Sequence, residues 1–366
     1  MSRHSPGATR IQLAVGLVAI AIVSLMAVRV LSESDWDPTI FTAFGDDANV
    51  ITTFAEDILG RDVITRATLG HDGKYFFVHA NDPWLIDPDR TAGVIDRPLY
   101  RTQRMLYPVL AGGGGLFSGE VVVWALLVVN VVAIGVGSWA VAELAMDMGG
   151  SSWWGLAFVL NIGFISEVMI DGAGVVAAAF AFWAVVLMRR GRALPAIAFL
   201  ALAALAREAM LLAAAGTAVW LWMDGRKGLA VRTVSYPAVA VVGWAAYTRF
   251  RIGVDTGVSQ VQEIGLPFGG VLDAVESWMG DPVDLAAGVA ILGLLAFYSR
   301  RVLKSRELVG WAFLGFVPLA LLFTRQVWES YFDISRAIAP TVTSFVLLLF
   351  LTEQLDATNK SVTAAS

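Results

Sequence analysis

The amino-acid sequence predicts an all-α, polytopic integral membrane protein with about ten transmembrane segments and a large first extracytoplasmic loop. Of its 366 residues, 57% are hydrophobic and only 16% are charged, and the mean hydropathy is +0.68. Soluble domains are typically about 45 to 50% apolar and about 25% charged. The composition therefore excludes an ordinary soluble enzyme. The formal net charge of -5 excludes a basic surface for nucleic acid, and the absence of cysteine excludes disulfides and thiolate metal sites.

The first membrane segment is predicted from Ile11 to Leu31, because a bilayer core of about 30 Å needs about 20 mainly apolar residues. It is longer than the apolar region of a signal peptide, about 7 to 15 residues, so we interpret it as a retained anchor helix. The chain then divides into a cytoplasmic N-terminus with this helix (1–31), an extracytoplasmic loop (32–104), a multi-helix membrane domain (105–352) and a cytoplasmic tail that we expect to be disordered (353–366).

The loop 32–104 carries thirteen acidic residues and one amphipathic segment, Ala48 to Leu59. Val50, Phe54 and Ile58 recur there at steps of four, so one helical face is apolar. The segment is too short to span a bilayer, and we expect it to lie on the outer membrane surface. Asp46 and Asp47 precede it. Asp47 could cap this helix, and either acid is also a candidate catalytic residue.

Nine further apolar runs complete the predicted set of ten segments. They are Val121 to Leu144, Trp153 to Ile170, Gly172 to Met188, Leu194 to Ala206, Met210 to Met223, Val234 to Thr248, Leu285 to Tyr298, Val309 to Phe323 and Ala337 to Leu351.

Ionisable residues are the reason for two of the divisions between these runs. Glu167 and Asp171 interrupt one long apolar stretch, and Arg207-Glu208 interrupts another. An ionisable group at the bilayer centre costs at least about 2.5 to 3.5 kcal/mol. A single helix from Leu194 to Met223 would also be about 45 Å long, beyond the bilayer core. We therefore predict two short helices that meet at Arg207-Glu208 near the outer surface.

The distribution of basic residues predicts the orientation. With ten segments and both termini in the cytoplasm, every basic cluster falls on the cytoplasmic side, as the positive-inside rule requires. The clusters are Arg3 and Arg10; Arg189, Arg190 and Arg192; Arg226, Lys227 and Arg232; and Arg300, Arg301, Lys304 and Arg306. The remaining polar loops then face outward, so any chemistry is predicted to be extracytoplasmic.

The densest polar pattern lies between Gly70 and Pro108. Gly70 and Gly73 flank His71-Asp72, and Lys74 and Tyr75 follow. Arg101 and Arg104 then come just before an apolar run. One interpretation is a surface loop whose arginines meet lipid phosphates.

The same pattern resembles the first outer loop of predicted bacterial polytopic glycosyltransferases of the GT-C superfamily. Looser similarities are Arg207-Glu208-Ala-Met-Leu-Leu at a helix start and Arg336-Ala-Ile-Ala-Pro340 at the entry to the last helix. The resemblance implies a polyprenyl-phosphate sugar as donor and an acid in this loop as catalytic base or metal ligand. Asp72 is the best match for that acid and Asp46 or Asp47 the second, because the Asp-Glu pair of better-known members is absent.

The residues themselves fit this chemistry. Displacing a lipid phosphate from a sugar requires a carboxylate to accept the proton of the attacking hydroxyl and cations to stabilise the departing charge. The candidate phosphate ligands at the outer edge are Arg101, Arg104, Arg207 and Arg336, because the planar guanidinium donates two hydrogen bonds at once. We place His71, Lys74, Tyr75 and Glu208 in the substrate pocket.

Salt bridges within the protein are the alternative role for two of these arginines. Arg207 could pair with Glu208, Glu167 or Asp171, and Arg336 could pair with Asp333. His71 and His79 could join a nearby Asp around a divalent metal, but their eight-residue spacing matches no known ligand motif. The metal requirement therefore stays open, and no other cofactor is assigned.

The sequence thus predicts an inverting glycosyltransferase of the cell membrane. Its expected partners are the lipid bilayer, a polyprenyl-phosphate-linked sugar and an extracytoplasmic glycan, lipid or protein acceptor, with no nucleic acid. A transporter or flippase for a phosphorylated lipid could use the same arginines for binding alone, and a non-catalytic membrane scaffold is the third alternative.

Overall fold

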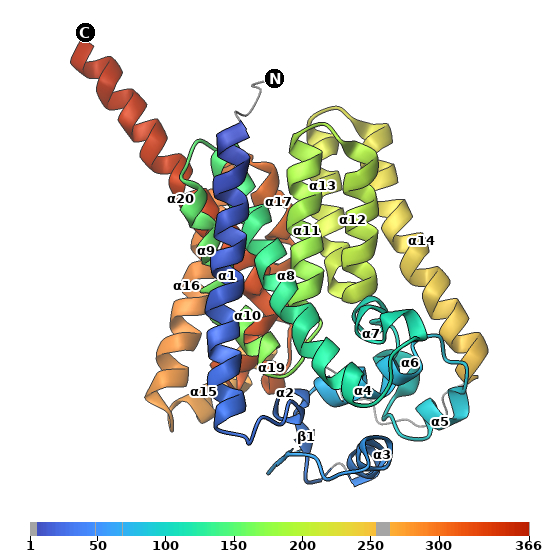
Figure 1. Cartoon of the computed structure of the whole chain (residues 1–366). Coiled ribbons are helices and arrows are strands. Elements are labelled where there is room, and N and C mark those ends of the chain that lie inside the picture. The colour runs from blue at the N-terminus through green and yellow to red at the C-terminus, as the bar shows by residue number, and fades with distance from the viewer. Residues whose placement is uncertain (1–5, 48, 68, 254–263, 366) are drawn as a thin grey trace.

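The computed structural model describes residues 6–47, 49–67, 69–253 and 264–365, and its secondary structure is almost entirely helical (Figure 1). Within this part of the chain, the one sheet has two strands of two residues each, β1 (Phe44–Gly45) and β2 (Thr65–Arg66), which pair in parallel. The predicted all-α fold class is confirmed.

Five helices among the described residues contain a stretch that is long and apolar enough to cross a membrane. They are α1 (Pro6–Ser32), α8 (Glu120–Asp147), α14 (Lys227–Ile252), α16 (Pro282–Ser305) and α20 (Tyr331–Ala365). Each contains one of the predicted apolar runs or most of it. These helices indicate a protein that is inserted in a membrane.

Shorter apolar helices account for four more of the predicted segments. They are α11 (Gly174–Arg189), α12 (Ala193–Ala206), α13 (Leu211–Met223) and the pair α17 (Leu308–Leu314) and α18 (Phe316–Leu322). Between α12 and α13, Arg207 has extended backbone angles (φ -153°, ψ 117°), and a 3-10 turn at Glu208–Met210 follows. The predicted break at Arg207-Glu208 is confirmed.

The predicted segment Trp153 to Ile170 is not a single helix. It is divided into a 3-10 turn (Ser152–Gly155), α9 (Leu156–Val159) and α10 (Ile162–Val168). Asn161 explains the interruption. Its side-chain oxygen accepts a hydrogen bond from the backbone N–H of Gly163 and so caps α10, while its amide nitrogen donates to α20 at the Ala339 carbonyl and the Thr343 hydroxyl.

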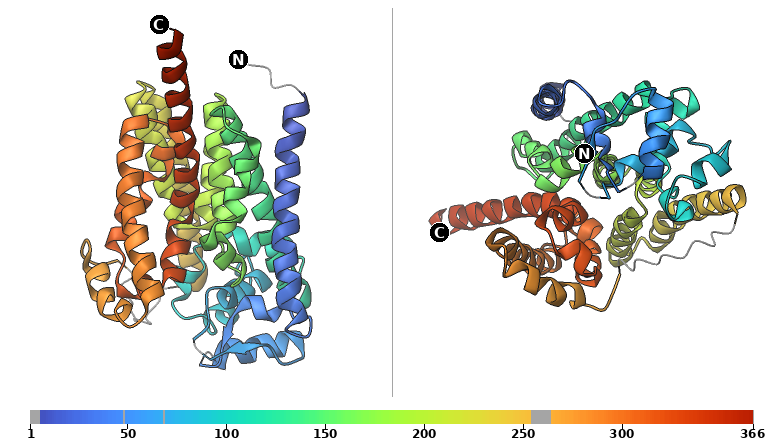
Figure 2. Two further views of the ribbon diagram at one scale, coloured as in Figure 1. Left: turned by 90° about the vertical axis from the view of Figure 1, so that its left-hand side faces the viewer. Right: turned by 90° about the horizontal axis from the view of Figure 1, so that it is seen from below.

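A layer of short elements lies at one end of the long helices, between α1 and α8 in the sequence (Figure 2). In this region the longest described helix has 11 residues. Besides the two strands and a 3-10 turn (Gly113–Gly115), the layer contains α2 (Thr39–Thr42), α3 (Asn49–Leu59), α4 (Gly73–Asn81), α5 (Pro88–Ala92), α6 (Pro98–Arg101) and α7 (Leu106–Ala111).

Helix α3 corresponds to the predicted amphipathic segment, but its apolar face is turned toward protein. Ile51 and Ala55 are buried, and Phe54 and Ile58 pack against the main core. Much of the apolar face thus packs on α4 and β1, whereas Val50 is exposed, and the position on the outer membrane surface stays a prediction. Residue 48 lies outside the described residues, so the predicted capping of this helix by Asp47 has no structural description here.

The C-terminal third adds α15 (Gly269–Trp278) and α19 (Arg325–Trp328). Trp278 and Trp328 form the centre of a small second apolar core together with α16, α18 and α20. Helix α20 continues to Ala365, through the tail for which the sequence predicts disorder.

The two ends of the bundle have opposite characters. At one end lie the basic clusters of the interhelical loops, which we call the basic joints. There, Arg189 and Arg190 at the end of α11 pair with Glu307 before α17 and with Glu143 and Asp147 at the end of α8. Helix α1 begins and helix α20 ends at this end of the bundle in Figure 1. The layer of short elements covers the opposite end.

Candidate functional site

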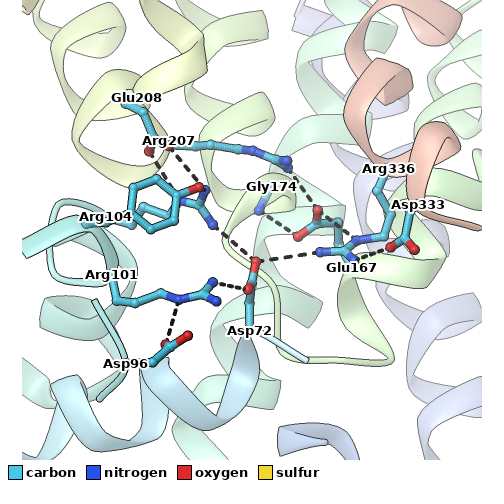
Figure 3. A network of polar contacts seen from close by, with 11 residues as sticks. Asp72, Asp96, Arg101, Arg104, Glu167, Gly174, Arg207, Glu208, Asp333 and Arg336 are labelled. Carbon is cyan, nitrogen blue, oxygen red and sulfur yellow. Dashed lines mark hydrogen bonds and ion pairs between the residues drawn. The ribbon is translucent and has the colours of Figure 1, made fainter. Parts of the chain in front are cut away.

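Four arginines and four carboxylates from distant parts of the sequence meet where the layer of short elements joins the long helices (Figure 3). These eight residues, which we call the arginine cluster, are Asp72, Arg101, Arg104, Glu167, Arg207, Glu208, Asp333 and Arg336. Six of them were site candidates from the sequence. Glu167 and Asp333 appeared there as alternative salt-bridge partners, and Glu167 also as a residue that divides two segments.

Asp72 lies at the centre of the arginine cluster, immediately before α4. Its side chain makes no capping hydrogen bond to that helix. Instead, its carboxylate accepts a hydrogen bond from Arg101 Nη1 at 2.7 Å and another from Arg104 Nη1 at 3.1 Å, and Arg336 Nη2 lies 3.9 Å away. Asp72, Arg101 and Arg336 therefore converge, although they are far apart in the sequence.

The surrounding guanidiniums control the charge of this carboxylate. Burial by itself would raise the pKa of Asp72, but attraction by Arg104, Arg101 and Arg336 outweighs burial and holds the pKa well below its usual range. Asp72 is therefore ionised at neutral pH, and it is also a weaker base than a free aspartate.

Arg101 and Arg104 stand on a short, fixed turn. Pro98 begins α6, and the Thr102 hydroxyl donates to the Pro98 carbonyl. From α14, the indole N–H of Trp244 donates to the Thr102 carbonyl at 2.7 Å. The membrane helix α14 thus holds the turn from which both arginines reach Asp72.

Most donors of these two arginines are occupied by protein groups. Arg104 donates to both oxygens of Glu208 at 3.1 Å and to the Tyr100 hydroxyl at 2.9 Å. Arg101 donates to Asp96 at 3.2 Å and lies 4.0 Å from the ring centroid of Tyr75. Their main role in this structure is to hold Asp72 in place.

Glu167 bridges the other two arginines and is almost completely buried, with 2% of its side chain exposed. One of its oxygens accepts hydrogen bonds from Arg207 at 2.9 Å and from Arg336 at 3.2 Å. The other accepts from the Gly174 N–H, at the first residue of α11. A Cβ atom at Gly174 would collide with this carboxylate and with Arg207, so glycine is needed there.

Sequence reasoning used Glu167 to divide two segments and as one alternative partner of Arg207, and not as a site residue. The signal that could have identified it is its place in an apolar run, because an ionisable residue there is usually buried against a partner and functional. The salt bridges that the sequence analysis gave as alternatives are present: Arg207 pairs with Glu167, and Arg336 pairs with Asp333 at 3.0 Å. Arg336 also pairs with Glu167.

The other substrate-pocket candidates surround the arginine cluster without joining its ion pairs. The ring of His71 lies 5.8 Å from that of Phe332 on α20, and burial, with Arg336 nearby, lowers its pKa. Lys74 is buried and donates to the Leu69 carbonyl. Tyr75 lies under Arg101, and burial raises the pKa of its hydroxyl.

Asp46 and Asp47 are placed differently. Both are exposed, directly after β1, and the Asp46 N–H donates to the Arg66 carbonyl. Neither carboxylate has an ion pair with an arginine of the cluster in the described part of the chain. The structure therefore brings Asp72, and not these two acids, to the arginines.

The two histidines do not face a common site. His79 is buried against Trp244, 6.3 Å between ring centroids, and burial lowers its pKa to about 4, whereas His71 lies beside α20. Across the described residues, no three His, Asp or Glu side chains are arranged to hold a metal ion.

A small pocket of about 20 Å³, room for about one water molecule, borders the arginine cluster. Arg207 and Arg336 supply its charged lining. In the described ranges, Arg207 makes its hydrogen bond through Nη1 alone. The remaining lining residues are Phe164, Gly174, Ala209, Met210, Phe316, Leu319, Phe323, Ala337 and Pro340. The two guanidiniums are the charged groups of this lining, and guanidiniums bind the oxygens of a phosphate or carboxylate group.

Comparison of the chain with protein family models, with functionally described proteins and with solved structures found no match. The chemistry of the arginine cluster and of the pocket beside it is therefore what points to a function.

Proposed function

We propose that the chain is an inverting, GT-C-like membrane glycosyltransferase that moves a sugar from a polyprenyl-phosphate donor to an extracytoplasmic acceptor. The observation that supports this most is the apolar pocket with Arg207 and Arg336 at its wall, next to Asp72. A polyprenyl phosphate has the matching chemistry, because its chain is apolar and its phosphate can accept hydrogen bonds from both guanidiniums.

In the proposed reaction, the acceptor hydroxyl oxygen attacks the anomeric carbon from the side opposite the phosphate. A bond forms between that oxygen and the carbon, and the bond from the carbon to the phosphate oxygen breaks. The polyprenyl phosphate leaves with the electron pair, which the arginines stabilise. Asp72 accepts the proton of the attacking hydroxyl.

The ion pairs of Asp72 have a consequence for this step. With Arg101, Arg104 and Arg336 beside it and no donor phosphate bound, Asp72 is a weak base. A donor phosphate would share Arg336 and reduce its pull on Asp72. The basicity of Asp72 therefore rises when the donor is bound, so the base becomes active when there is a sugar to transfer.

The four arginines divide into two pairs with different tasks. Arg207 and Arg336 line the pocket and are the phosphate ligands of the proposal. Arg101 and Arg104, which the sequence analysis also assigned to phosphate, are mostly occupied by Asp72, Asp96 and Glu208, so they orient the base.

The orientation in the membrane belongs to the same proposal. We infer ten membrane segments in the cell membrane, with both termini and the basic joints in the cytoplasm, and the arginine cluster outside. The basic joints at one end of the bundle, and the arginine cluster at the other, support this arrangement (Figure 1).

Cysteine labelling tests this orientation directly, because the chain has no cysteine of its own. Lys304, in the predicted cytoplasmic joint 299–307, and Asp47, in the layer of short elements, are both exposed. In intact cells, a membrane-impermeant thiol reagent is expected to label Asp47→Cys and to label Lys304→Cys only after permeabilisation. The reverse pattern would contradict the proposed topology.

Replacing Arg336 by Ala is expected to weaken binding of a short-chain polyprenyl phosphate. Loss of a hydrogen bond to a charged group typically costs about 1.5 to 3 kcal/mol, roughly tenfold to a hundredfold in affinity. Binding would be measured by calorimetry in detergent micelles.

Two further variants make that measurement decisive. Arg336→Lys keeps the charge beside Glu167 and Asp333 and should retain part of the affinity. Arg325→Ala is the matched control, because Arg325 lies on α19 and pairs only with Glu329 and Ser277 among the described residues. Parent-like affinity in a folded Arg336→Ala protein would remove this arginine from the binding site.

A proteoliposome assay separates the proposed enzyme from a transporter or flippase. The purified protein would receive a panel of polyprenyl-phosphate sugars and acceptors. Release of polyprenyl phosphate together with a glycosylated acceptor supports a transferase, whereas movement of the lipid across the bilayer without product supports a transporter.

A further inference from the structure

A second site of different chemistry lies far from the arginine cluster. An apolar groove of about 500 Å³ runs between α13 and α14. Small side chains such as Ala215, Ala218 and Ala230 leave room in it, and the large apolar residues Trp222 and Val231 are more than half exposed. The full lining is Ala215, Ala218, Val219, Trp222, Met223, Ala230, Val231, Val234 and Ser235.

Positive charge gathers at the end of this groove, where α13 turns into α14. Lys227 is exposed, and its Nζ lies 5.3 Å from the ring centroid of Trp222, which itself lines the groove. Arg226 and the exposed Arg232 flank it, and Asp224 is the one acid of the turn, 3.6 Å from Arg226. The turn therefore keeps a net positive charge.

The position of the groove in the molecule suits a lipid. Helix α14 is long and apolar enough to span a membrane, so the groove opens along a membrane-facing helix and its basic end lies near the polar headgroups. The turn between α13 and α14 lies at the end of the bundle that carries the termini, opposite the layer of short elements (Figure 1). The groove is thus separate from the proposed sugar-transfer site.

We infer that this groove binds an anionic phospholipid of the leaflet in which the basic joints lie. One acyl chain occupies the apolar groove, and the phosphate contacts Lys227 and Arg232. Burial of the acyl chain supplies affinity for any lipid, while the cations supply the preference for an anionic head, because each basic residue near a membrane surface attracts anionic lipid.

A second groove in the same protein provides the control for this inference. It lies between α7, α8 and α11, has a volume of about 270 Å³, and is lined by apolar residues alone, such as Val128, Val132 and Phe180. It should accept acyl chains without regard to headgroup charge.

The test compares spin-labelled phosphatidylglycerol with spin-labelled phosphatidylcholine on the full protein in proteoliposomes, by electron paramagnetic resonance. The parent is expected to hold phosphatidylglycerol more strongly. Lys227→Gln with Arg232→Gln should reduce that preference by about fivefold for each cation removed. Arg192→Gln with Arg300→Gln removes two exposed cations from other basic joints and should leave the preference as in the parent.

A second experiment fills each groove with a large side chain and measures the same lipid preference. Val231→Trp, in the groove between α13 and α14, should remove the preference for phosphatidylglycerol, whereas Val132→Trp, in the control groove, should keep it. Equal binding of the two lipids to the parent, equal losses in the two Gln pairs, or an unchanged preference in Val231→Trp would each overturn the inference.

Discussion

Asp72→Asn is expected to lower sugar-transfer turnover by about a hundredfold to ten-thousandfold, the usual cost of removing a general base. Asparagine has the same shape and can still accept a hydrogen bond from Arg101, but it cannot take up the proton of the acceptor hydroxyl. Binding of polyprenyl phosphate should be retained or strengthened, because one negative charge disappears from among four guanidiniums. The measurement is product formation in proteoliposomes, with binding measured in parallel.

Two control variants isolate the role of Asp72. Asp333→Asn makes the same change in another carboxylate of the arginine cluster, one whose only ion pair among the described residues is with Arg336, and should have a small effect on turnover. Asp46→Asn with Asp47→Asn tests the competing assignment and should also be mild, because both acids are exposed and away from the arginines. Turnover close to the parent in a correctly inserted Asp72→Asn protein would show that Asp72 is not the base.

Glu167→Ala is expected to destabilise the protein by about 3 to 5 kcal/mol, because it leaves two guanidiniums without their buried counter-charge. Arg207 and Arg336 are 22% and 10% exposed in their side chains, and Glu167 is 2% exposed. The free energy of unfolding would be measured by titration of mixed micelles with a denaturing detergent. Glu329→Ala, which breaks the half-exposed pair with Arg325, should cost no more than about 1 kcal/mol.

A triple variant separates charge burial from general damage to packing. Replacing Glu167 with Leu and both Arg207 and Arg336 with Met removes this buried carboxylate together with the two arginines that it bridges. Apolar replacement of a complete buried ion group is often neutral or stabilising. The triple variant should therefore recover much of the stability lost in Glu167→Ala, although it cannot bind the donor phosphate. Equal destabilisation of the single and triple variants would refute the explanation by charge.

Apolar periodicity and charge placement were enough to predict most helices. The break at Arg207-Glu208 followed from the cost of ionisable groups in a bilayer, and the structure has it at the predicted residues. The division of 153–170 could not be predicted in this way, because it depends on Asn161, whose partners Ala339 and Thr343 lie on α20, far along the chain.

The same limit applies to the candidate site. Residue type and position at the membrane edge selected the four arginines as candidates, and the glycine-flanked setting and the resemblance from Gly70 to Pro108 selected Asp72. Which arginine contacts which carboxylate depends on tertiary packing, so the separate tasks of Arg104 and Arg207 were not visible in the sequence. The role of Glu167 was hidden for the same reason, since nothing near it in the sequence indicates that Arg336 is its partner.

The long sequence separation within the arginine cluster also bears on how the protein is made. Arg336 follows Glu167 by 169 residues, which at about 5 to 20 residues per second corresponds to about 10 to 30 s of translation. During that time the buried carboxylate of Glu167 has Arg207 as its available counter-charge. Insertion of α20 completes the ion group and closes one wall of the pocket. A chain released before α20 is synthesised would carry both an open pocket and an under-neutralised carboxylate, and cellular quality control could recognise it by these defects.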